Sequence, residues 1–181
     1  GTLDLFASGV LPVLIGEATK IFDYLLHSDK VYHAMIQFGA VSDTDDPDGT
    51  ISNITGKPVT ENDLKGAFPQ FIGRIQQTAP KYSALKINGK RSSDLARENI
   101  KVPPKTRLVT IHEIRLESFD SATQSAELTI RCGSGTYIRS LARDMGRLLY
   151  NGAYLKELRR HRSGGVELKD CLALETIAPD N

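Results

Sequence analysis

Apolar residues recur at intervals of three and four in three stretches of the chain, the spacing of a helix that buries one face. The first stretch runs from Ile15 to Leu26, the second follows a capping box at Thr60-Glu61-Asn62-Asp63, and the third runs from Ile138 to Leu149. Each is predicted to be a helix with a buried stripe, and Pro69 should end the second one early. A short fourth helix is predicted near Ala153 to Arg160.

Alternation of side chains between two faces predicts the strands. Tyr32, Ala34, Ile36 and Phe38 share one side of a predicted strand from Val31 to Phe38, and Ala126 to Cys132 alternates in the same way. A further strand is predicted over about Leu108 to Phe119, and the acidic stretch Ser42 to Gly49 contains Pro-Asp-Gly, which favours a turn. Strands in hairpin-like order with helices between them predict an α+β fold rather than a doubly wound parallel sheet.

The segment 81–107 follows neither pattern. It is polar and basic, and Asn88-Gly89 and Pro103-Pro104 interrupt it, so we expect an excursion from the core with at most a short helix around Asp94 to Asn99. Eight Lys and Arg residues against two acidic residues give this segment a local net charge of +6.

Charge is segregated along the chain, although the 181 residues carry a formal net charge of only +1. The stretch from Arg131 to Arg162 has a net charge of +6, and the stretch from Asp23 to Asp63 has a net charge of −6. Two basic zones of this kind could follow a phosphate backbone, because binding depends on local potential. They could equally be solvated faces, so charge alone leaves a nucleic-acid partner open.

Composition excludes several classes of protein. With 40% hydrophobic and 25% charged residues, the chain is expected to fold around a core. No apolar run approaches the roughly 20 residues that span a bilayer, so no membrane association is expected. Two cysteines are too few for a disulfide scaffold and point to a reducing compartment. The four histidines share no ligand-like spacing, and no glycine-rich nucleotide loop is present, so neither a metal nor a nucleotide cofactor is expected.

Two stretches could carry chemistry. Asp4 stands beside the apolar pair Leu5-Phe6, where a carboxylate either caps the backbone or serves as a nucleophile or base, and spacing alone favours the cap. The second, Gly133 to Arg139, lies at a strand-to-helix junction whose free N–H groups attract anions, or it is a plain turn with Thr136 as the N-cap. Because Arg139 in a first helical turn opposes the helix dipole, it calls for an anionic partner.

Several of these pieces, taken in order, resemble one family, the tRNA pseudouridine synthases of the TruB type. The resemblance runs from the first residue almost to the last, and its order makes it specific where any one piece would be weak. The matching stretches are Gly1-Thr2-Leu3-Asp4, Ser8 to Pro12, Gly16 to Lys20, Asp29-Lys30-Val31-Tyr32, Ser42 to Asp45, Pro80 to Lys86, Gly135 to Ser140 and Leu158-Arg159-Arg160.

The resemblance implies a reaction and a role for each matching residue. Uridine at position 55 in the TΨC arm of tRNA would become pseudouridine without a cofactor or metal, with Asp4 as the nucleophile and Arg139 paired with it. Tyr32 would stack on the flipped-out base and is the candidate to take the proton from C5. The other matching positions are Tyr137 and Leu158, which would line the uridine pocket, and Lys81 and Lys86, which lie in a thumb-like RNA clamp over 81–107.

The resemblance also sets expectations for the domain. Residues 1–181 would form a pseudouridine synthase catalytic domain with a mixed, mostly antiparallel central sheet flanked by helices, acting as a cytoplasmic monomer. The family has an N-terminal strand and a Gly-His loop before the position of Gly1, and often a PUA domain after that of Asn181. We expect no activity without the N-terminal part.

The chain departs from the family pattern at three places. Leu5 stands where Pro is usual, Ser134 where many members have a basic residue, and Ser92-Ser93 where the thumb has an aromatic residue. The first affects the stiffness of the loop, and the other two affect RNA affinity.

Two alternatives remain, a non-catalytic RNA-binding or tRNA-folding module and a guide-RNA-dependent pseudouridine synthase. An enzyme requires that Asp4, Tyr32, Tyr137 and Arg139 converge on one cleft, although they lie far apart in sequence.

Overall fold

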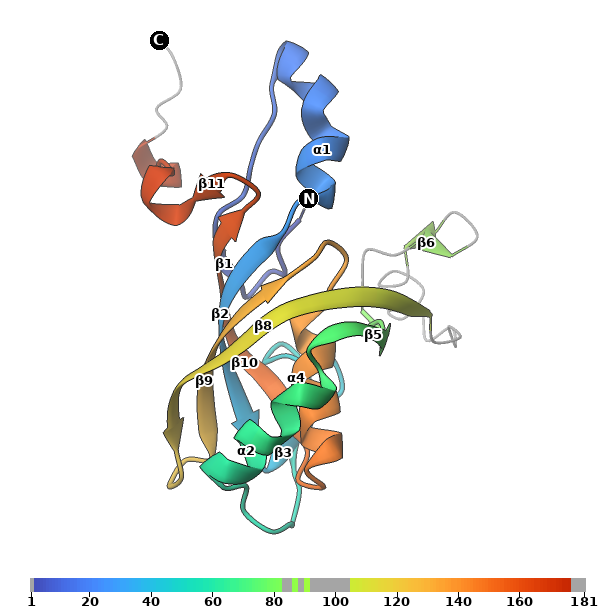
Figure 1. Ribbon diagram of the computed structural model, residues 1–181, viewed down its shortest axis with the longest axis vertical. Coiled ribbons are helices and arrows are strands. Elements are labelled where there is room, and N and C mark those ends of the chain that lie inside the picture. Colours follow the sequence, from blue (N-terminus) through green and yellow to red (C-terminus); the bar gives the residue numbers. More distant parts are fainter. Residues whose placement is uncertain (1, 83–85, 88–89, 92–104, 177–181) are drawn as a thin grey trace.

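A seven-stranded sheet forms the centre of the computed structural model, which describes residues 2–82, 86–87, 90–91 and 105–176 (Figure 1). The strand order is β1-β10-β2-β9-β8-β5, with β11 paired to β10. Its strands are β1 (Ser8–Gly9), β2 (Lys30–Phe38), β5 (Gly73–Thr78), β8 (Thr106–Asp120), β9 (Ser125–Cys132), β10 (Ala153–Ser163) and β11 (Val166–Glu167).

Within this sheet β1 and β10 run parallel, and every other neighbouring pair is antiparallel. The mixed, mostly antiparallel sheet of an α+β fold is therefore confirmed. Two short hairpins stand apart from it, β3 (Ala40–Ser42) with β4 (Ile51–Asn53), and β6 (Lys86–Ile87) with β7 (Lys90–Arg91).

The described helical segments are short. They are the 3₁₀ helices η1 (Gly16–Ile21), η2 (Phe68–Gln70), η3 (Leu168–Asp170) and η4 (Leu174–Thr176), and the α-helices α1 (Phe22–His27), α2 (Glu61–Ala67) and α4 (Ile138–Leu148). In the described part of the chain, no helix is long and apolar enough to cross a membrane.

The core lies between α4 and one face of the sheet. The predicted alternation holds, because Ala34, Ile36 and Phe38 of β2 are buried, as are all four apolar positions of β9 from Ala126 to Cys132. The helical stripe of α4 packs onto β10 and β2, with Leu141 and Met145 fully buried. The face of β2 that carries Val31 and His33 points the other way.

The predicted helix near Ala153 to Arg160 is wrong, because these residues belong to β10, which pairs with β2. Two register shifts interrupt the pairing, one between Leu155 and Glu157 and one between Arg160 and Arg162. Each shift moves the inward-facing position by one residue, so Leu155, Leu158 and Arg160 are buried at mixed spacings. Such spacing resembles a helical pattern more than the strict alternation of a strand.

The predicted helix from Ile15 to Leu26 forms, as η1 followed by α1, but its buried stripe does not. Neither segment contains a buried residue, and the Ile15 and Phe22 side chains are exposed. Figure 1 shows the segment formed by η1 and α1 extending beyond the end of the sheet. The spacing correctly predicts an amphipathic helix, but it does not say whether another element packs against the apolar face.

The capping box at Thr60 is confirmed: the Thr60 hydroxyl accepts from the Asp63 N–H, and the Asp63 carboxylate accepts from the Thr60 N–H. As expected, the α-helix stops at Ala67, before Pro69. The edge strand β5 has no counterpart in the sequence prediction, because its residues Arg74 to Thr78 are mostly polar. The short helix expected around 94–99 lies outside the described residues.

Candidate active site

Arg139 uses all five of its N–H donors. Its Nε donates to Asp4 Oδ2 (2.9 Å), and its Nη2 donates to Asp4 Oδ1 (2.8 Å) and to the Tyr82 carbonyl (3.0 Å). Its Nη1 donates to Asp46 Oδ2 (3.0 Å) and to the Thr44 carbonyl (3.2 Å). Every donor of this guanidinium therefore has a protein acceptor, which its burial requires, because the side chain is only 5% exposed.

Three distant segments supply these groups. Asp4 begins a turn closed by the Ala7 N–H on the Asp4 carbonyl, just before β1. Asp46 lies in the acidic turn after β3, where its Oδ1 accepts from the Thr44 hydroxyl and the Asp48 N–H. Arg139 stands in the first turn of α4, 135 residues from Asp4 and 93 from Asp46. The acidic stretch therefore forms a turn, as predicted, and also supplies a charged partner for Arg139.

Two carboxylates provide the anionic partner that the position of Arg139 in α4 requires. They differ in exposure: the Asp4 side chain is 34% exposed and that of Asp46 is 7% exposed. Asp46 therefore pairs with the guanidinium on its buried side. Of the two carboxylates, Asp4 is the one that a ligand can reach. A bidentate guanidinium fixes the orientation of the carboxylate with which it pairs.

A second arginine reinforces this end of α4. Arg143 forms ion pairs with Asp45 (2.8 Å) and Asp144 (2.9 Å) and donates to the Thr78 carbonyl. Burial raises the pKa of the Asp45 carboxyl above its ordinary value, although Arg143 opposes that change. Neighbouring residues of one loop, Asp45 and Asp46, thus pair with two arginines four positions apart on one helix.

Tyr32 lies beside this centre on β2, opposite Arg160 of β10. Burial raises the pKa of the Tyr32 phenol; the hydrogen bond and charge of Arg160 oppose the shift, and the charge of Asp4 adds to it. Arg160 is itself buried and donates to the carbonyls of Val10 and Thr2. It therefore ties the segment that carries Asp4 to the strand next to Tyr32.

None of the contacts described for the other predicted site residues is to Asp4, Arg139 or Tyr32. Tyr137 is the N-cap of α4, and the Arg107 guanidinium lies 5.2 Å from the centre of its ring. Leu158 is almost fully buried on β10, opposite Ala34. Lys81 is exposed, with its ammonium 5.4 Å from the Tyr82 ring. Lys86 begins β6, and its side chain is not described.

Two local alternatives that the sequence left open are not found. Among the described residues, the Asp4 carboxylate pairs with Arg139 and caps no backbone, and the Thr136 hydroxyl donates back to the Gly133 carbonyl instead of capping α4. The structure also places two residues at the site that sequence reasoning did not single out: Asp46, which pairs with Arg139, and Arg160, which holds the segment that carries Asp4. Of these residues, only Arg160 was indicated by the sequence, because it belongs to the stretch Leu158-Arg159-Arg160 that resembles the family.

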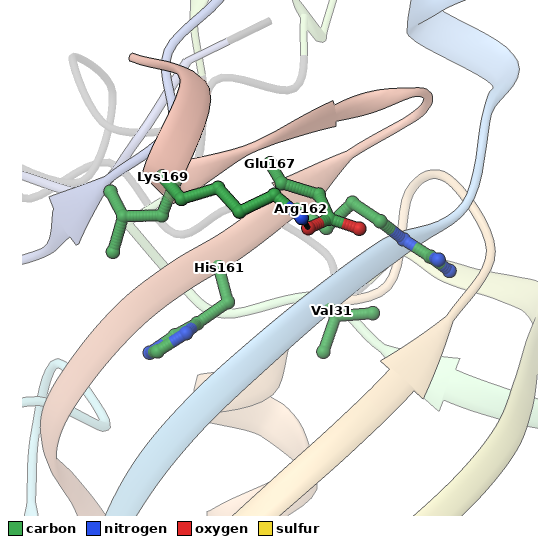
Figure 2. Close-up of a pocket in the computed structure, with 6 residues that line it drawn as sticks. Val31, His161, Arg162, Glu167 and Lys169 are labelled. Atoms are coloured by element: carbon green, nitrogen blue, oxygen red, sulfur yellow. Dashed lines mark ion pairs between the residues drawn. The ribbon is translucent and has the colours of Figure 1, made fainter. Parts of the chain in front are cut away.

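Other hollows lie elsewhere on the sheet. A cavity of about 360 Å³ lies against β10 and β11 and is lined by Val31, His161, Arg162, Glu167, Leu168 and Lys169 (Figure 2). A second of about 400 Å³ shares Val31 and His161 and reaches Tyr32 and His33. Neither is lined by Asp4 or Arg139. Among the described residues, no three His, Cys, Asp or Glu side chains are grouped to hold a metal ion.

Comparison with known proteins gives one consistent result. Residues 1–138 match the model of the N-terminal domain of the TruB family pseudouridylate synthases. The tRNA pseudouridine synthase B of Methylobacillus flagellatus is 42% identical over 98% of this chain, and that of Chromohalobacter salexigens is 45% identical over 92%. The chain spans 58% and 54% of the lengths of these two relatives.

Solved structures with the same fold come from a related group. A chain in the crystal structure of a Cbf5–Nop10–Gar1 complex is 29% identical, with a TM-score of 0.68. A chain in an H/ACA RNP bound to a substrate RNA containing 2'-deoxyuridine is 26% identical, with a TM-score of 0.64. The match covers 92% of this chain in both cases, and 40% and 38% of those chains.

Asp46→Asn tests whether the second carboxylate stabilises the centre. The substitution keeps the shape of the side chain but removes the charge that faces Arg139, so we expect the free energy of unfolding in urea to fall by about 2 kcal/mol. Asp48→Asn removes the same charge from an exposed position in the same loop and should change it by less than about 0.5 kcal/mol. Equal effects of the two substitutions would contradict a structural role for the Asp46 charge.

Proposed function

The chain belongs to the TruB family of pseudouridylate synthases, and from this membership we propose that it is the catalytic domain of an enzyme that isomerises uridine 55 in the TΨC arm of tRNA. The observation that carries the proposal is the bidentate pair between the partly exposed Asp4 and the buried Arg139. It supplies an oriented carboxylate at the position that resembles the family's catalytic aspartate.

The proposed reaction rearranges bonds within one nucleotide. The N1–C1′ bond breaks, the base rotates, and a C5–C1′ bond forms; C5 loses a proton and N1 gains one. Nothing is oxidised and no group enters or leaves, so a cofactor has no task. The Asp4 carboxylate can add to C6, attack C1′, or promote a glycal-like intermediate, and each route uses the carboxylate that the bidentate pair with Arg139 holds in one orientation.

Tyr32 is proposed to stack on the flipped-out base and to accept the C5 proton. Because burial raises its pKa above the ordinary value near 10, the phenol is neutral at about pH 7. To accept a proton it must first release its own, and Arg160 is the neighbouring cation that favours the phenolate. Stacking needs no ionisation and offsets part of the stacking that the base loses when it leaves the loop.

The choice of tRNA over a guided RNA rests on similarity. Identity is 42–45% to proteins named tRNA pseudouridine synthase B and 26–29% to the chains in the H/ACA-type complexes. We place the RNA contacts on the basic segment 81–107 and on the exposed bases of the stretch from Arg131 to Arg162, namely Arg147, Lys156 and Arg159, with the protein acting as a cytoplasmic monomer. Neutralised phosphates would make RNA affinity fall steeply with salt.

Asp4→Asn tests the nucleophile. In the natural polypeptide that contains this chain, we expect the substitution to lower tritium release from tRNA labelled at uridine C5 by about three orders of magnitude, with the tRNA Kd nearly unchanged. Asp23→Asn, which removes the same charge from the exposed face of α1, should leave the rate unchanged. Activity retained by the Asp4 variant rejects the nucleophile; RNA binding without any tritium release by the unmodified protein supports a non-catalytic module.

Tyr32→Phe tests the proton acceptor, because it keeps the aromatic face and removes the phenol. If the phenolate accepts the proton, the rate should rise with pH between about 7 and 9, because the ionised fraction grows tenfold per pH unit below a raised pKa. The variant should bind tRNA normally, react far more slowly and lose this rise. Equal rates and equal pH profiles for the two proteins contradict the role of Tyr32 as base.

A further inference from the structure

The backbone of Tyr137 is held by a single side chain from another strand. The Tyr137 N–H donates to Gln77 Oε1 (2.8 Å), and Gln77 Nε2 donates to the Tyr137 carbonyl (3.0 Å). Gln77 lies on the edge strand β5, 60 residues away, and is only 1% exposed. One planar amide thus pairs with both polar groups of one residue, which fixes its orientation as well as its distance.

The start of α4 lacks the usual cap. Tyr137 is in an extended conformation at the N-cap and makes no side-chain capping bond, and the nearby Thr136 hydroxyl is bonded to Gly133. Since the first N–H groups of a helix have no partners within it, the entry to the helix is held from outside. Gln77 supplies this support, and the adjacent Thr78 carbonyl accepts from Ser140 and Arg143.

Gln77 acts next to a cross-strand neighbour that holds the ring of the same tyrosine. In the pairing of β5 with β8, Gln77 stands opposite Arg107. The Arg107 guanidinium lies 5.2 Å from the centre of the Tyr137 ring, and its Nη1 donates to the Gly135 carbonyl (3.3 Å). Figure 1 shows β5 crossing α4, and the bonds of Gln77 to Tyr137 and of Ser140 to Thr78 place the strand against the start of that helix. The two neighbours therefore fix the main chain and the ring of Tyr137 together.

We propose that Gln77 is a positioning residue for the isomerisation: its amide fixes Tyr137 so that the ring borders the uridine site, two residues before Arg139. The inference rests on the proposed function, because Tyr137 matches a position that lines the uridine pocket. Among the described residues, the Gln77 side chain hydrogen-bonds to Tyr137 and to neither Asp4 nor Arg139, so it is proposed to act through Tyr137. A small displacement of a positioned group can lower a rate by about a hundredfold, so the loss of two orienting bonds should be visible in the chemical step.

The test compares two neighbouring glutamines in single-turnover isomerisation of tRNA by the natural polypeptide. Gln77→Met keeps the length of the side chain and removes both bonds, so we expect the rate constant to fall by about tenfold or more with an unchanged tRNA Kd. Gln76→Met is the control, because Gln76 is exposed on the same strand. If Gln77→Met does not fold, Gln77→Glu replaces it; this variant retains an acceptor for the Tyr137 N–H and loses the donor to the Tyr137 carbonyl, so we expect it to lower the rate constant relative to Gln76→Met, by less than about tenfold.

Repeating the comparison with Tyr137→Ala separates positioning from general support of the sheet edge. If Gln77 acts through the Tyr137 ring, Gln77→Met should have little further effect once the ring is absent. An equal loss with and without the ring, or a rate equal to that of Gln76→Met, overturns the inference and leaves the proposed function intact. Absence of pseudouridine with the unmodified protein overturns both.

Discussion

The buried guanidinium of Arg139 is the constraint on which the rest of the site depends. A cation with five donors, nearly removed from water, is stable only if each donor finds an acceptor and its charge is balanced. Asp4 and Asp46 supply the opposite charge, and the Thr44 and Tyr82 carbonyls accept from the remaining donors. These partners come from the N-terminal turn, the acidic turn after β3 and the segment after β5. Satisfying one side chain therefore requires three separate parts of the chain to be in place.

The same arrangement fits Asp4 to the nucleophilic role proposed for it. Its partner is buried and held from behind by Asp46, whereas Asp4 itself is one-third exposed. The sheet supplies the remaining geometry: β1 runs beside β10, and Arg160 of β10 holds the Asp4 segment through the Val10 and Thr2 carbonyls. Tyr32 is placed nearby by the pairing of β2 with β10. The segment of Asp4 and the strand of Tyr32 come near each other because β1, β10 and β2 are consecutive in the sheet.

How much the sequence predicts depends on what each pattern encodes. Strict alternation identified β2 and β9, and the helical stripe identified α4, because these elements bury one regular face. The register shifts of β10 break its alternation, so the strand could not be recognised from its sequence. The apolar residues of α1 are exposed, which shows that an amphipathic pattern does not specify which element packs against the helix. For the site, the helix dipole indicated that Arg139 needs an anion, but only the family resemblance pointed to Asp4. Asp46 and Gln77 were hidden because a turn aspartate and a polar edge-strand residue have ordinary local explanations.

The most direct test of the account is to map pseudouridine by chemical modification and primer extension on a tRNA transcript incubated with the natural polypeptide that contains this chain. A centre built on Asp4 and Arg139 in a TruB-family domain predicts one new pseudouridine, at position 55 of the TΨC arm. A transcript with no pseudouridine, or with pseudouridine only at other uridines, would contradict it.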